Sequence, residues 1–81
     1  MSVRKRLGEL NKGQAGRILS VGTSSAPFTR RLLEMGLLEG AVVELIHEAP
    51  FGGDPVAVRV RGALIALRRN EANQIEVELL P

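Results

Sequence analysis

Few residues in this sequence are of the types that carry out chemistry. The chain has one histidine, His47, and one aspartate, Asp54, and it has no cysteine, tryptophan or tyrosine. A serine–histidine–aspartate triad would need both of these residues together with a serine, and no spacing in the chain supports such a set. The nucleotide-binding pattern G-x-x-x-x-G-K-[ST] is also absent. The sequence therefore predicts a protein that is not an enzyme.

The candidate metal ligands are equally few. A structural zinc site usually takes four cysteine or histidine ligands, and this chain has only His47. His47 and its neighbour Glu48 could supply part of a weak or intermolecular site for Fe²⁺ or Zn²⁺. A single histidine near the end of a strand is more often an ordinary surface residue. We therefore expect that no cofactor is required.

The basic residues are concentrated at the N-terminus. Arg4, Lys5 and Arg6 hold three of the eleven basic side chains, which leaves eight basic and nine acidic residues in the rest of the chain. We predict a basic, solubilising tail over residues 1–6 and a single domain over residues 7–81; a phosphate-binding arm is the alternative for the tail. The other arginines occur in pairs without interleaved aromatic residues for base stacking, so no nucleic acid partner is expected. These pairs are Arg30 and Arg31, Arg59 and Arg61, and Arg68 and Arg69.

The stretch "APFGGDP" (residues 49–55) combines turn residues with an apolar entrance. Gly52 and Gly53 allow the chain to reverse, Asp54 can bond to nearby backbone, and Pro55 can begin the next strand. Turn formation does not explain Pro50 and Phe51, one of only two phenylalanines. Two hypotheses remain open for Phe51. In the first, Phe51 covers an open end of the fold. In the second, Phe51 forms an exposed apolar contact for a partner together with Pro50 and the Leu37–Leu38 corner.

The clearest predicted element is a helix over residues 26–35. Ser25 can cap its first turn, and Phe28, Leu32 and Met35 recur at the spacing of one helical face. Gly36 can take the positive φ that ends a helix, after which Leu37 can fold back onto the helix.

The other segments show the period-two alternation of short strands. Strands are predicted over 14–22, 41–48, 56–62, 63–69 and 74–80, with single turns at 7–10 and 70–73. Further turns are predicted at Gly40 and Gly62. The alternation places Val43, Leu45 and His47 on one face of their strand, and Val56, Val58 and Val60 on one face of the next. In the last strand, Ile75, Val77 and Leu79 are expected to point inward. About five short strands and one helix in 81 residues predict a mainly β protein, a small and partly open barrel.

Three segments together resemble the family of ferrous iron transport protein A (FeoA). They are "LLEMGLLEG" (32–40), "APFGGDPVAVRVRG" (49–62) and "IALRRNEANQI" (65–75), in this order, and the resemblance extends over about residues 7–79. It implies an SH3-like barrel with the helix inserted after the first strand. It also implies a small cytosolic accessory protein of bacterial ferrous iron uptake, with no catalytic residues to carry over.

The partner that this resemblance implies is the membrane ferrous iron permease, which has a cytosolic GTPase domain. The chain shows no secretory signal, and its longest apolar run, "ALIAL", is far shorter than the roughly 20 residues that span a bilayer. We therefore expect a cytoplasmic protein that reaches the membrane only through its partner. The alternative is an SH3-like regulatory barrel that acts with a metal-dependent repressor or with nucleic acid.

Overall fold

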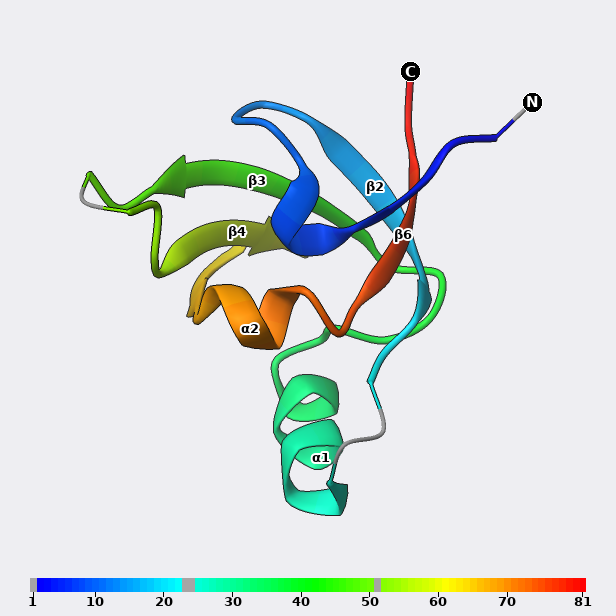
Figure 1. Cartoon of the computed structure of the whole chain (residues 1–81). Helices are drawn as coiled ribbons and strands as arrows, with labels where there is room; N and C mark the ends of the chain where they lie inside the picture. The colour runs from blue at the N-terminus through cyan, green and yellow to red at the C-terminus, as the bar shows by residue number, and fades with distance from the viewer. Residues whose placement is uncertain (1, 23–24, 51) are drawn as a thin grey trace.

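One antiparallel sheet forms most of the structure. The computed structural model describes residues 2–22, 25–50 and 52–81. Within them the strands lie in the order β1-β6-β2-β3-β4-β5, and every neighbouring pair is antiparallel. Figure 1 shows the sheet curving around the core, while helix α1 stands outside it. The elements are β1 (Arg4–Arg6), the 3₁₀ turn η1 (Leu7–Glu9), β2 (Ala15–Ser20), α1 (Ala26–Glu34), β3 (Val42–Glu48), β4 (Val56–Val60), β5 (Ala63–Leu67), α2 (Arg69–Ala72) and β6 (Glu76–Leu79).

The hydrophobic core forms where the inward faces of the strands meet. On β4 the three valines are buried while Arg59 is exposed, as the alternation predicts. Val43 and Leu45 of β3 and Val77 of β6 are fully buried on the same side. Each aliphatic side chain buried in this way contributes about 1.5–3 kcal/mol relative to an exposed position. The predicted faces of these strands are therefore confirmed, except for His47.

His47 is exposed because β3 is bulged. The pairing between β3 and β4 shifts register between Leu45 and His47. A bulge adds one residue to a strand, so side chains beyond it point to the other face. The prediction that His47 lies on the same face of the strand as Val43 and Leu45 is therefore wrong.

Helix α1 begins and ends as the sequence predicts. The Ser25 hydroxyl accepts a hydrogen bond from the backbone N–H of Phe28 at 3.2 Å. Leu32 is fully buried, and Phe28 and Met35 are partly buried against the core. The Arg31 guanidinium also contacts Glu71 of α2 at 2.5 Å, which connects the helix to the rest of the fold. None of the helices in the described ranges is long and apolar enough to cross a membrane.

Gly36 has φ +89°, so we expect Gly36→Val to destabilise the fold. An added Cβ would find space, because its nearest neighbour is the Arg61 Cδ at 3.8 Å. The cost is therefore conformational, and a left-handed backbone costs an L-residue about 1–2 kcal/mol. Thermal denaturation should show a lower melting temperature for Gly36→Val and a smaller decrease for Gly36→Asn, since asparagine tolerates this conformation better. Equal melting temperatures for all three proteins would disprove the helix-stop argument.

The N-terminal segment differs from the prediction. Residues 1–6 were expected to form a tail, but Arg4–Arg6 form β1, which pairs with β6. The Arg4–Glu76 ion pair that accompanies this pairing is long, at 3.8 Å, and largely exposed, so it contributes little. Main-chain hydrogen bonds hold the strand: the N–H of Leu79 donates to the carbonyl oxygen of Val3 at 2.7 Å. This strand raises the count from the predicted five or so to six within the described residues.

Candidate functional site

The loop between β3 and β4, residues 49–55, projects from one end of the sheet (Figure 1). Its two arms are joined by backbone hydrogen bonds. The N–H of Ala49 donates to the Pro55 carbonyl, and the N–H of Gly53 donates to the Ala49 carbonyl, both at 3.1 Å. Pro50 is exposed at the loop entrance. Phe51 lies outside the described residues, so both hypotheses for its role remain predictions.

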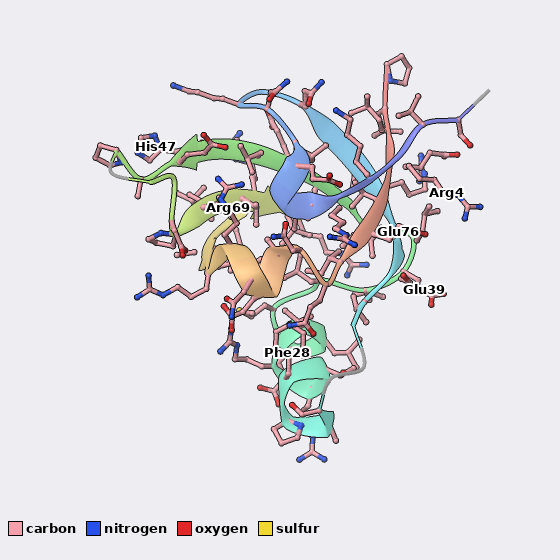
Figure 2. All side chains as sticks on the ribbon, in the orientation of Figure 1. Arg4, Phe28, Glu39, His47, Arg69 and Glu76 are labelled. Carbon is pink, nitrogen blue, oxygen red and sulfur yellow. The ribbon has the colours of Figure 1, made fainter. Side chains whose placement is uncertain are left out.

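Arg69 anchors this loop to the body of the protein. Its Nη2 and Nε atoms donate to the Gly53 carbonyl oxygen at 2.7 and 3.1 Å. Nη1 donates to the carbonyl oxygen of Gly8 in η1, and Nη2 also contacts the Glu48 carboxylate at 3.1 Å. Figure 2 shows Arg69 lying next to η1. One guanidinium group thus connects α2, η1, the end of β3 and the loop.

The loop residues are adapted to this anchor. The Asp54 carboxylate accepts from the backbone N–H of Arg69 at 3.0 Å, so both ends of that arginine residue contact the loop. Gly53 has φ +69°, and a Cβ built on it would lie 3.0 Å from the Arg69 Nη2 atom. Glycine is therefore favoured at Gly53 by its backbone conformation and by the close approach of the guanidinium. The other predicted turn glycines also have positive φ: Gly36, Gly40, Gly52 and Gly62. The Asp54–Pro55 peptide bond is cis.

The predicted Leu37–Leu38 corner does not join the loop surface. Leu37 is fully buried in the core, and Leu38 is half-buried. The corner precedes β3 and the loop follows β3. The seven residues of this strand span about 20 Å, so the strand's length separates the corner from the loop. Leu37 was expected to contact a partner, which is wrong because its side chain packs inside the protein. The candidate surface is therefore reduced to the loop itself.

The two candidate metal ligands lie at the base of the loop. His47 and Glu48 are exposed, and the Glu48 carboxylate is engaged by Arg69. Figure 2 shows His47 near the loop end of β3. Across the described part of the chain, no three histidine, aspartate or glutamate side chains gather as a metal site would require.

Nothing in the sequence indicates the special role of Arg69. Arg68 and Arg69 are adjacent and identical in type, yet the only ion pair of the Arg68 side chain within the described ranges is an exposed contact with Asp54 at 3.9 Å. The acceptors of Arg69 lie 16 and 61 residues away in the chain. Only the folded arrangement brings them together. In the other two arginine pairs, Arg31 and Arg59 contact separate carboxylates, Glu71 and Glu44.

A shallow hollow lies along α1. Its walls are contributed by Ser25, Ala26, Thr29, Arg30 and Leu33. Arg30 is the one titratable residue among them, and the Thr29 hydroxyl donates to the Gly22 carbonyl at 2.9 Å. This hollow brings together no set of reactive side chains.

Comparison with known families identifies the domain. A family model described as the FeoA domain matches residues 5–79, nearly the whole chain. The chain belongs to the FeoA family. A curated relative from Porphyromonas gingivalis, the Fe(2+) transport protein A/Fe(2+) transporter FeoB fusion protein, is 39% identical to this FeoA chain over 75 residues. The match covers 93% of the chain but only 9% of the relative's length.

Solved FeoA structures have the same fold. The solution structure of FeoA from Chlorobium tepidum matches with a TM-score of 0.88 and 38% identity, over 95% of this chain and 71% of that one. FeoA from Stenotrophomonas maltophilia, solved with zinc and described as a prokaryotic SH3 domain protein, matches with a TM-score of 0.77 and 33% identity, over 95% and 88% of the two chains. The predicted mainly β, SH3-like fold is therefore confirmed.

Proposed function

We propose that this FeoA protein is an accessory or regulatory protein of bacterial ferrous iron uptake that binds the cytosolic part of an FeoB-type membrane permease with a GTPase domain. The observation that carries this proposal is the relative in which the two transport proteins form one fusion protein. Such a fusion holds both modules at high effective concentration, which favours a direct contact between them. The separate FeoA chain then makes the same contact as a peripheral cytosolic protein.

The β3–β4 loop is the surface that we assign to this contact. Pro50 is exposed there, and Phe51 adds an aromatic residue of the kind that often dominates binding energy at interfaces. Contacts of Arg69 with Gly53 and Asp54 hold the second arm of the loop to the body of the protein. A loop that is already fixed loses less conformational freedom on binding, which favours affinity.

The alternative function, with a metal-dependent repressor or nucleic acid, has less support. A helix-turn-helix needs two helices, whereas the described residues hold one nine-residue helix and one of four residues. Salt dependence distinguishes the two functions. The affinity for nucleic acid phosphates decreases steeply as salt increases, whereas the affinity of an apolar protein contact does not.

Ferrous iron uptake by cells tests the proposal. Deleting the gene for this protein from a strain that takes up Fe²⁺ through the permease should change the uptake rate. Expression of the wild-type protein should restore the original rate. A strain that lacks the permease is the control, and there the deletion should have no effect. Unchanged uptake in the strain that has the permease would contradict the accessory role.

We also expect the purified protein to bind Fe²⁺ or Zn²⁺ weakly at most, through His47 and Glu48 if it binds them at all. Two adjacent exposed ligands, one of them engaged by Arg69, form an incomplete site. Calorimetric titration with each metal should show no tight binding, and His47→Ala should remove any weak signal. Tight one-to-one binding that survives His47→Ala would show that the ligands lie elsewhere.

A further inference from the structure

The two edges of the sheet differ in how they are protected. The β1 edge carries Arg4, Lys5 and Arg6, and charged residues of this kind discourage pairing with other chains. The β5 edge, "ALIAL" (Ala63–Leu67), has no charged residue. β5 pairs only with β4 within the described residues, and its main-chain groups appear in no other backbone hydrogen bond there. One edge of the sheet is therefore open to pairing.

The β5 edge also exposes apolar side chains. Leu64 is 63% exposed, the largest exposure among the big hydrophobic residues in the described ranges. Ala63 and Ala66 are exposed as well, and Ile65 is half-buried. In Figure 1, β5 is the short yellow segment between β4 and α2. An uncharged edge strand with exposed apolar side chains can accept an added strand from another protein.

Positive charge surrounds this apolar edge. Arg61 lies at one end of β5 and Arg68 at the other, while Arg59 pairs directly across from Leu64. Arg61 makes no ion pair within the part of the chain that the structure describes. The partners of Arg59 and Arg68 lie at 3.8 and 3.9 Å, and both arginine side chains are more than half exposed. Such pairs are weak, so a bound segment with carboxylates can compete for these arginines.

The charges also disfavour a second copy of this chain as the occupant. If two β5 strands paired antiparallel about Ile65, Arg68 of each copy would lie at the end of the strand pair where Arg61 and Gly62 of the other copy lie. Cations of the two copies would then gather at both ends of the pair. Like charges across a strand pair are destabilising.

We propose that β5 accepts an extended segment of a partner protein, apolar at its centre and acidic at its flanks, as a seventh strand of the sheet. Main-chain hydrogen bonds would supply affinity, Leu64 and Ala66 would contact the apolar centre, and the three arginines would select acidic flanks. This surface adjoins the loop at Arg68, which contacts Asp54 at 3.9 Å, but its test does not require the permease.

Synthetic peptides test the proposal with the wild-type protein. The first has a Val-Thr-Val-Thr-Val centre with Asp-Glu flanks, the second has the same centre with Lys flanks, and the third is the acidic peptide with N-methylated valines. NMR hydrogen exchange of the Ala63–Leu67 amides is the measurement. We expect the acidic peptide to slow this exchange, less so at high salt, and the other two to have no effect. Equal protection by all three peptides, or no protection by any, would overturn the proposal.

Two variants then locate the site. Leu64→Glu places a negative charge at the centre of the proposed surface and should weaken binding of the acidic peptide about tenfold or more. Leu33→Glu is the matched control, because Leu33 is 50% exposed but lies on α1, and this variant should bind normally. Equal weakening by both variants would refute the assignment to β5. Protection of β5 that rises with protein concentration alone would show that a second copy occupies the edge and would also overturn the proposal.

Discussion

Leu37→Ala should lower the free energy of unfolding by about 2–5 kcal/mol, the usual cost of cutting a fully buried leucine to alanine. Leu37 has no exposed surface, and its backbone N–H donates to the Leu32 carbonyl at 2.9 Å, so the chain turns back on the helix at this residue. The substitution would leave a cavity between α1 and the sheet. Urea denaturation measures the effect directly.

Leu33→Ala is the matched control for this prediction. Leu33 lies on the same helix but is half exposed, so its truncation should change the free energy of unfolding by no more than about 0.5 kcal/mol. Equal stability of the two variants would show that Leu37 is not a core residue. The reason for excluding Leu37 from the partner surface would then be wrong.

Arg69→Ala should have the second largest effect, a loss of about 1.5–3 kcal/mol of stability, typical of hydrogen bonds that involve a charged group. The variant would leave the Gly53 and Gly8 carbonyl oxygens without the donors that they have now. The β3–β4 loop should then open more often. We expect a lower urea midpoint and faster hydrogen exchange at the Gly53 amide.

Arg68→Ala provides the comparison. Its side chain is 67% exposed and has one contact at 3.9 Å, so the change should cost about 0–1 kcal/mol and leave exchange at Gly53 unaltered. If Arg68→Ala accelerated exchange of the loop as much as Arg69→Ala, the loop would not depend on the one guanidinium that we identify as its anchor.

The sequence predicts the parts of this fold that follow from local periodicity. The alternating valines of β4, the helix capped by Ser25 and the stop at Gly36 are each determined by residues close in the chain. Local periodicity does not predict β1, because Arg-Lys-Arg has no apolar alternation. Its strand conformation depends on pairing with β6, more than 60 residues away in the chain.

The candidate site was less predictable than the fold. The glycines and prolines predict the loop, but the strand alternation places His47 on the wrong face because a bulge has no clear sequence signal. Leu37 was placed on a surface because adjacent leucines resemble an exposed corner, whereas the helix stop turns Leu37 inward. Arg69 was missed because its acceptors are main-chain oxygens, which exist at every position of a chain.

The measurement that tests the central claim most directly is a binding titration of this FeoA protein against the purified cytosolic GTPase region of the permease. We predict binding that changes little with salt and that weakens by about 1–3 kcal/mol in Phe51→Ala, as for a residue that dominates an interface. Leu33→Ala should bind like the wild-type protein. The absence of binding, or binding that decreases steeply with salt and is unaffected by Phe51→Ala, would contradict the account.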